Sequence, residues 1–193
     1  MKRIAVYCGS STGHDPAYSR AAAGLGETLA RRGIGLVFGG GRVGLMGVIA
    51  DAVLAHGGDV RGVIPKALAT KELAHAGVTE LFVVPTMHER KAKMAELADG
   101  FVAMPGGFGT LDETYEMITW AQLGFHHKPV AFFNVNGYFD SLLAFATRAV
   151  SDGFVRAEHA AMAIVASSPD DLLARMESYT GPPAPKWIGL GET

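Results

Sequence analysis

The feature that most constrains the fold is a regular alternation of short apolar runs with longer, helix-length segments. Most of the short runs are apolar at consecutive positions rather than at every second one, which is typical of strands buried on both faces of a parallel sheet. They lie at 4–8, 34–38, 60–64, 81–84, 101–104, 130–133 and 163–165, and the helix-length segments at 15–32, 43–56, 86–98, 110–123, 137–151 and 169–177. The pattern predicts one doubly wound α/β domain with a mostly parallel sheet of about seven strands.

The length of 193 residues suits a single domain, which we place at 1–180. Only the last stretch, TGPPAPKWIGLGET, departs from the alternating pattern. Its prolines exclude a regular helix, so we predict a flexible or surface-docked tail over 181–193. The first apolar run ends after five residues, which is too short for a signal core or a membrane span.

Charge and cysteine content narrow the class of partner. The chain carries 17 Lys and Arg against 19 Asp and Glu, a formal charge of −2, so no summed basic field favours a nucleic acid or an anionic membrane. We therefore expect a small-molecule partner. A single cysteine, Cys8, allows neither an intramolecular disulfide nor a CxxC metal motif, which fits a reducing compartment and predicts a cytoplasmic protein.

Three glycine-rich clusters each follow a predicted strand directly: CGSS at 8–11, FGGGRVGLMG at 38–47 and MPGGFGT at 104–110. One such cluster is equally well explained as a tight turn. Ligands of doubly wound sheets bind beyond the carboxyl ends of the strands, where glycines let the backbone approach a ligand and the first N–H groups of a helix bind an anion. Together the clusters predict a nucleotide or phosphate pocket, with Ser10, Gly40 and Gly41 as candidate contacts.

The clusters complete neither of the common nucleotide motifs. Gly39, Gly41 and Gly44 match G-x-G-x-x-G, but Asp59, the acid at about the right distance, precedes the next strand instead of following it, which argues against NAD or FAD. The third cluster lacks the lysine of a P-loop, so no side chain there reaches β and γ phosphates. A monophosphate is favoured, and we predict neither a cofactor nor a metal.

Glu113 lies on an apolar helical stripe. It aligns with Met117 and Trp120 at i, i+4 and i+7, so its carboxylate shares a face with core residues. A second interpretation stays open at this point, in which Thr110 is the N-cap of the helix and Glu113 completes a capping box.

Arg90 lies on a similar stripe one helix earlier, where it aligns with Met94 and Leu97 behind a possible capping pair of Thr86 and Glu89. Buried charges are costly unless they are paired or used. We therefore expect Arg90 to meet the carboxylate of the next helix above the sheet.

The other candidates have ordinary structural interpretations. His126 and His127 are adjacent rather than at i, i+4, so we take them as loop residues and not as metal ligands. Cys8 at a strand end is more typical of a small buried residue than of a nucleophile. The methionines are most simply core, some of them lining the pocket: Met87, Met94, Met104 and Met117.

These motifs together resemble a known family. MHERK at 87–91, PGGFGTLDE at 105–113 and ITWAQLG at 118–124, with the second glycine cluster, are similar to the LONELY GUY family, the cytokinin riboside 5′-monophosphate phosphoribohydrolases, often labelled lysine decarboxylases. The resemblance covers about residues 4–150. It implies a Rossmann-like fold, a homodimer, and hydrolysis of the N-glycosidic bond of adenosine 5′-monophosphates, N6-modified ones included, to free base and ribose 5-phosphate.

The resemblance also implies roles for particular residues. Arg90 and Glu113 match the family's catalytic pair. Its phosphate-binding loop matches Gly107, Gly109 and Thr110, and its other substrate contacts match Glu72, Lys91 and Thr119. A carboxylate suits this chemistry, because breaking an N-glycosidic bond develops positive charge on the ribose.

Two other classes of protein share parts of this pattern. A non-catalytic nucleotide or molybdenum-cofactor carrier would keep the glycine loops but would not need the Arg–Glu pair. A pyridoxal-phosphate decarboxylase would need a Schiff-base lysine and an acid for the pyridine nitrogen, and no lysine in this chain has a context that singles it out. The sequence favours the hydrolase, with the carrier as the alternative.

Overall fold

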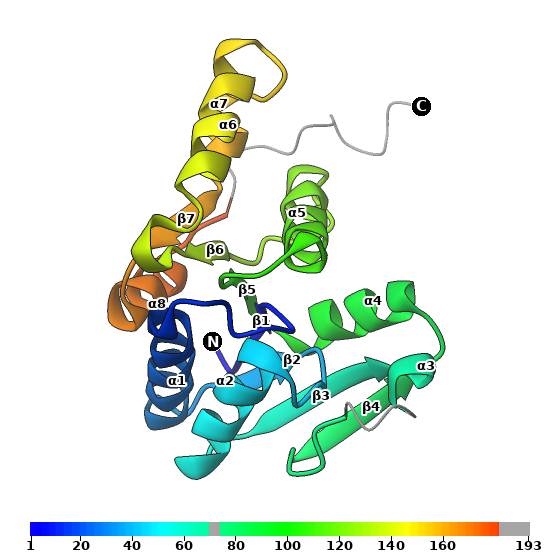
Figure 1. The fold of residues 1–193 in the computed structure, drawn as a ribbon. Coiled ribbons are helices and arrows are strands. Elements are labelled where there is room, and N and C mark those ends of the chain that lie inside the picture. The colour runs from blue at the N-terminus through cyan, green and yellow to red at the C-terminus, as the bar shows by residue number, and fades with distance from the viewer. Residues whose placement is uncertain (70–73, 182–193) are drawn as a thin grey trace.

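The computed structural model describes residues 1–69 and 74–181. Within them the strands form one seven-stranded sheet in the order β4-β3-β2-β1-β5-β6-β7, and every neighbouring pair is parallel (Figure 1). The strands are β1 (Arg3–Tyr7), β2 (Gly35–Phe38), β3 (Val60–Pro65), β4 (Glu80–Val84), β5 (Gly100–Ala103), β6 (Val130–Phe133) and β7 (Ala163–Ala166). The predicted fold class and the place of each strand are thus confirmed.

The helices fill the connections between the strands. They are α1 (Pro16–Arg31), α2 (Gly44–Ala55), α3 (Lys66–Ala69), α4 (Met87–Leu97), α5 (Phe108–Gln122), α6 (Asp140–Ser151), α7 (Ala157–Ala160) and α8 (Pro169–Glu177), with a 3-10 turn, η1, at Val135–Gly137. The short helices α3 and α7 were not predicted, because four residues are too few to show a helical periodicity. The predicted tail falls outside the described residues, apart from Gly181.

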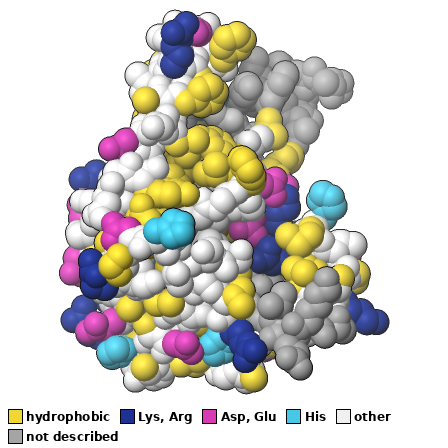
Figure 2. All heavy atoms as spheres, viewed as in Figure 1, with side chains coloured by type: hydrophobic (Ala, Val, Ile, Leu, Met, Phe, Trp, Pro, Cys, Tyr) yellow, Lys and Arg dark blue, Asp and Glu magenta, His cyan; other side chains and the backbone are white. Residues whose placement is uncertain are grey.

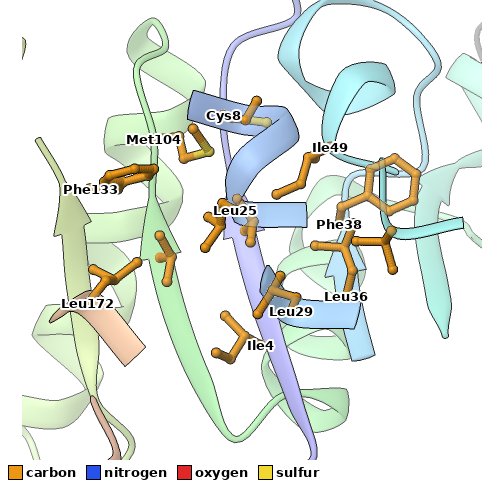
Figure 3. Close-up of a cluster of buried hydrophobic side chains, with 14 of the residues drawn as sticks. Ile4, Cys8, Leu25, Leu29, Leu36, Phe38, Ile49, Met104, Phe133 and Leu172 are labelled. Atoms are coloured by element: carbon orange, nitrogen blue, oxygen red, sulfur yellow. The ribbon is translucent and has the colours of Figure 1, made fainter. Parts of the chain in front are cut away.

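Helices cover both faces of the sheet (Figure 1). On one face α1 and α2 bury residues such as Leu25 and Ile49 against β1 and β2, and α8 buries Leu172 against β6 and β7 (Figure 3). On the other face α4 and α5 bury Met94 and Met117 in a second apolar cluster. No helix within the described ranges is long and apolar enough to cross a membrane.

The sheet reverses its winding at β1, whose neighbours are β2 on one side and β5 on the other. Such a switch point opens a crevice at the carboxyl ends of the strands. Backbone hydrogen bonds bring the three glycine loops together there, because the N–H of Gly9 donates to the carbonyl of Pro105 and the N–H of Leu45 donates to the carbonyl of Gly9, each at 3.0 Å.

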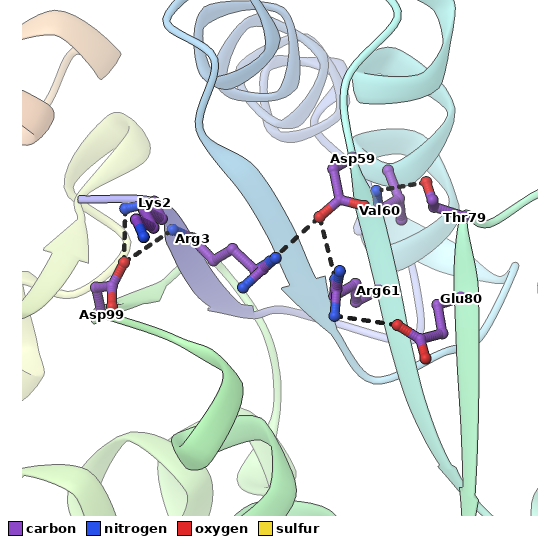
Figure 4. Close-up of polar contacts among 8 residues, drawn as sticks. All are labelled: Lys2, Arg3, Asp59, Val60, Arg61, Thr79, Glu80 and Asp99. Carbon is purple, nitrogen blue, oxygen red and sulfur yellow. Dashed lines mark hydrogen bonds and ion pairs between the residues drawn. The ribbon is translucent and has the colours of Figure 1, made fainter.

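A network of ion pairs lies at the other end of the strands, near their amino termini (Figure 4). Asp59 accepts from Nε of both Arg3 and Arg61, at 3.2 and 3.1 Å, and Arg61 also pairs with Glu80 at 3.0 Å. These residues lie at or next to the amino ends of β1, β3 and β4. Asp59 therefore lies away from the glycine loops and is in no position to bind a ribose there.

Candidate active site

A cavity of about 330 Å³ opens at the switch point between β1 and β5. Its walls come from β1 and its loop, from the loop after β2 and the start of α2, from the first turn of α4 and from the first two turns of α5. The lining residues are Val6, Tyr7, Cys8, Gly9, Ser10, Gly39, Met46, Arg90, Gly107, Phe108, Gly109, Thr110 and Glu113. All three glycine clusters thus contribute to one cavity.

The first turn of α5 presents its backbone to this cavity. Gly107 is the N-cap, and no side chain in the described part of the chain caps this helix end, so its first N–H groups are available to an anion. A Cβ built on Gly107 would meet nothing within 4 Å, which shows that the space beside these N–H groups is open.

The start of α5 overturns the capping-box interpretation of Glu113. The helix begins at Phe108, so Thr110 lies inside the first turn instead of at the N-cap. A glycine can occupy the N-cap without a side-chain oxygen, and for that reason the sequence signal placed the N-cap three residues too late, at Thr110 instead of Gly107. Capping does not explain Glu113.

Arg90 and Glu113 meet as predicted. Thr86 caps α4 by accepting from the N–H of Glu89 at 3.1 Å, and this places Arg90 on the inner side of the first turn. Nη1 of Arg90 donates to Oε1 of Glu113 at 2.6 Å, and Nε donates to the carbonyl of Val63 at 3.1 Å. The two side chains are only 11% and 10% exposed, so the charges are held in a site from which most water is excluded.

Gly39 makes room for the guanidinium. A Cβ at this position would collide with Nη2 of Arg90. The glycine cluster after β2 therefore allows Arg90 to lie across the end of that strand, with its guanidinium against the backbone.

Burial sets the protonation behaviour of the cavity. It raises the pKa of Glu113, and the Arg90 guanidinium opposes this effect. Burial also raises the pKa of the Cys8 thiol, so this side chain stays protonated and is a poor nucleophile. Within the described ranges no cluster of His, Cys, Asp and Glu could hold a metal ion.

The other candidate residues are distributed around this cavity in different ways. Ser10 lines it, together with Gly107, Gly109 and Thr110. Gly40 and Gly41 do not: a Cβ on Gly40 would face Ile64, and Gly41 forms a backbone bridge with Ala74. Glu72 lies outside the described residues.

Lys91 points away from the cavity. It is 7% exposed, and its Nζ forms ion pairs of 3.1 Å with Asp112 and Glu116 of α5. Successive helical residues are turned about 100° apart, so Lys91 cannot share the orientation of Arg90. The ion pairs connect α4 and α5 beside the Arg90–Glu113 pair.

Thr119 lies on the outer side of α5, in an apolar groove of about 740 Å³. We use the name outer groove for this surface, whose walls include Tyr115, Ile118, Thr119, Phe145, Ala149 and His159. Figure 2 shows hydrophobic side chains gathered on this part of the molecule, where Figure 1 places α6 and β7.

The four candidate methionines differ in burial. Met94, Met104 and Met117 are fully buried, but Met87 is 45% exposed, because the first residue of α4 extends beyond the sheet; the prediction that it is core was wrong. Sequence analysis missed Met46 as a cavity residue, although it lies within the second glycine cluster.

Known proteins resemble this chain over most of its length. The family model described as "Possible lysine decarboxylase" matches residues 46–176. A probable cytokinin riboside 5′-monophosphate phosphoribohydrolase, LOGL5 of Oryza sativa subsp. japonica, is 50% identical over 95% of this chain and 74% of its own. The phosphoribohydrolase LOG7 of Arabidopsis thaliana is 49% identical over 93% of this chain and 82% of its own.

The chain belongs to the LONELY GUY family. Solved structures of other proteins share the fold of this family member at lower identity. The molybdenum cofactor carrier protein of Chlamydomonas reinhardtii is 21% identical, with a TM-score of 0.70 over 92% of this chain and 96% of its own. The molybdenum cofactor binding protein of Rippkaea orientalis is 22% identical, with a TM-score of 0.69 over 91% and 95%. They confirm the architecture alone.

Proposed function

We propose that this LONELY GUY protein hydrolyses the N-glycosidic bond of adenosine 5′-monophosphates, N6-modified ones included, to free base and ribose 5-phosphate. The observation that carries the proposal is the buried Arg90–Glu113 pair, which lines the same cavity as the open N-terminus of α5. A carrier has no need of a desolvated charge pair beside its anion site, and the relatives that are about half identical are named as phosphoribohydrolases.

Different parts of the cavity have different roles in the proposed reaction. The N–H groups at the start of α5 bind the phosphate. The bond between the anomeric carbon and the base breaks with its electron pair leaving on the base, and positive charge develops on the ribose. The carboxylate of Glu113 stabilises that charge and orients a water molecule, which adds its hydroxyl to the anomeric carbon while its proton balances the departing base.

Arg90 acts on the substrate through Glu113. Its guanidinium keeps its charge at every working pH, so it is not the acid that protonates the base. Its short hydrogen bond fixes one carboxylate oxygen and favours the ionised form, against the effect of burial. The other oxygen, Oε2, is then the one that faces the ribose.

The proposal is tested by comparing nucleotides with their nucleosides. Each hydrogen bond to the phosphate contributes about 1.5–3 kcal/mol and each 1.4 kcal/mol is tenfold, so losing two of them lowers kcat/KM for adenosine at least about a hundredfold relative to AMP. Released base and ribose 5-phosphate are quantified by chromatography, with the N6-isopentenyl, uridine and nicotinamide monophosphates testing base selectivity. Equal kcat/KM for AMP and adenosine contradicts the phosphate anchor, and no release from any nucleotide favours the carrier.

We also propose that the protein is a cytoplasmic homodimer that associates through the outer groove. Helix α6 contains no buried residue, and Phe145 on it is 67% exposed. An apolar helix side of this kind is typical of a protein–protein interface. The single cysteine, which is buried and free, supports the compartment.

A further inference from the structure

Tyr7, the last residue of β1, lies beneath the catalytic pair. The alternation of the strand directs Val6 toward α1 and α2 and Tyr7 toward α4 and α5, so the two residues belong to different apolar clusters. The Tyr7 ring is 1% exposed and stacks on Phe101, with the ring centroids 6.2 Å apart and the planes 5° from parallel. A phenylalanine would satisfy this packing equally well.

Packing does not explain why residue 7 carries the hydroxyl group of a tyrosine. Its oxygen is buried and has no hydrogen-bond partner among the described residues. An unpaired buried hydroxyl destabilises a fold, and such groups in native proteins call for an explanation. Tyr7 lines the same cavity as Arg90 and Glu113, so the explanation is to be sought in that site.

The Tyr7 hydroxyl can donate a hydrogen bond, and Glu113 has a carboxylate oxygen that can accept one. Burial, followed by the negative charges of Glu113 and Glu116, raises the pKa of Tyr7 well above its ordinary value, against the effect of Arg90. The hydroxyl therefore keeps its proton at every working pH. Among the described residues the hydrogen bond that Glu113 accepts reaches Oε1 and comes from Arg90, which leaves Oε2 with spare acceptor capacity.

We propose that Tyr7 is a positioning residue, whose hydroxyl donates to the carboxylate of Glu113 once that side chain turns toward it, and which thereby holds the carboxylate in the orientation that faces the ribose. This inference rests on the proposed function for its kinetic consequences. The carboxylate is then held from two sides, by Arg90 of α4 and by Tyr7 of β1. A hydrogen bond donated to an ionised carboxylate favours that form.

Several ionisable groups influence the pKa of Glu113, and a test of Tyr7 must separate its effect from theirs. Arg90 and Lys91 on α4 favour the ionised form, while Asp112 on its own helix disfavours it. On β1, Tyr7 and Cys8 are both influenced by the charge of Glu113, and both stay protonated. Substituting Tyr7 alone leaves the charged groups in place.

The test is Tyr7→Phe, which removes the hydroxyl and keeps the ring. We expect kcat for AMP to fall about tenfold with KM nearly unchanged, because positioning is lost and phosphate binding is not. The acid limb of the kcat profile moves to higher pH by about half a unit or more, since the carboxylate loses a donor. The melting temperature stays the same or rises, because an unpaired buried group is removed.

Tyr179→Phe is the matched control. Tyr179 follows α8 on the opposite face of the sheet and is partly buried, so its variant keeps the wild-type rate and acid limb. A Tyr7→Phe enzyme with wild-type kcat, or one that melts earlier while its acid limb stays in place, overturns the proposal, because a purely structural tyrosine predicts those results.

A second measurement does not depend on turnover. The side-chain carboxyl carbon of Glu113, labelled with ¹³C and assigned by its loss in Glu113→Gln, is titrated by NMR in the wild type and in Tyr7→Phe. A higher pKa of Glu113 in the variant supports the proposal, and an unchanged pKa overturns it. If neither protein releases base from any nucleotide, the proposed function fails and this titration still decides the role of Tyr7.

Discussion

The two sides of helix α5 both reverse the usual pattern of a surface helix. Its inner side buries a carboxylate, Glu113, beneath the cavity, and its outer side exposes Tyr115 and places Ile118 in the outer groove. A helix ordinarily buries its apolar residues and turns its charges to water. A buried charge and an exposed apolar surface each mark a site that another molecule completes. The same helix therefore faces the proposed catalytic site on one side and the proposed dimer interface on the other.

The strongest test of this division is Glu113→Gln, which removes the inner charge and nearly keeps the volume. We expect base release to fall at least about a thousandfold, with nucleotide affinity within about tenfold of wild type, because the lost interaction forms mainly in the transition state. Glu96→Gln is the control, since this carboxylate of α4 is 67% exposed, and its rate should stay within about threefold. Near wild-type turnover by Glu113→Gln, or its dissociation into monomers, would contradict the comparison.

The outer side is tested by Phe145→Asp. A charge in the middle of an apolar interface costs at least as much as a typical hot-spot truncation, so the dissociation constant of the dimer should rise about a hundredfold or more. Analytical ultracentrifugation across a dilution series measures it. Val83→Asp is the control, because this residue is 55% exposed on the edge strand β4, at the far end of the sheet from β7. An unchanged dissociation constant in Phe145→Asp would remove the outer groove from the interface.

Gly39→Ala tests the role of the inner side of α5, with a smaller expected effect. The added methyl displaces the end of the Arg90 side chain from the backbone of Gly39, and we expect kcat/KM to fall about tenfold as the guanidinium shifts from Glu113. The fold is retained, because a flexible side-chain end moves more easily than backbone. Gly24→Ala, where a Cβ would meet nothing within 4 Å, is the neutral control. A wild-type rate for Gly39→Ala would show that the position of Arg90 is not critical.

The sequence predicted the sheet and the contact between Arg90 and Glu113 for the same physical reason. Strands buried on both faces are apolar at consecutive positions, and Arg90 and Glu113 interrupt apolar stripes where a charge is otherwise unfavourable. Each signal is local in the chain. The same stripe also separates Arg90 from Lys91, whose orientation follows from helical geometry alone.

Other features depend on contacts between distant segments. The role of Gly39 follows from where a side chain of α4 comes to lie, and a glycine-rich loop alone does not indicate this. The strand pattern predicted that Tyr7 is buried but not that its hydroxyl is unpaired. Gly107, the N-cap of α5, has no side-chain oxygen that would mark it as a cap in the sequence. The predicted start of α5 is therefore too late, and the capping box that was considered does not form.

The seam between β1 and β5 determines when the site can exist during synthesis. Ile4 pairs with Gly100, so β1 gains its second neighbouring strand only after about half of the 193-residue chain has been made. Arg90 precedes this seam and Glu113 follows it. A growing chain that ends after α4 contains Arg90 but not Glu113 and has an open edge on β1, and contacts of such long sequence separation form late and slowly. The ribosome must therefore release the beginning of α5 before the cavity closes, and the ability to bind nucleotide becomes a late marker of correct folding.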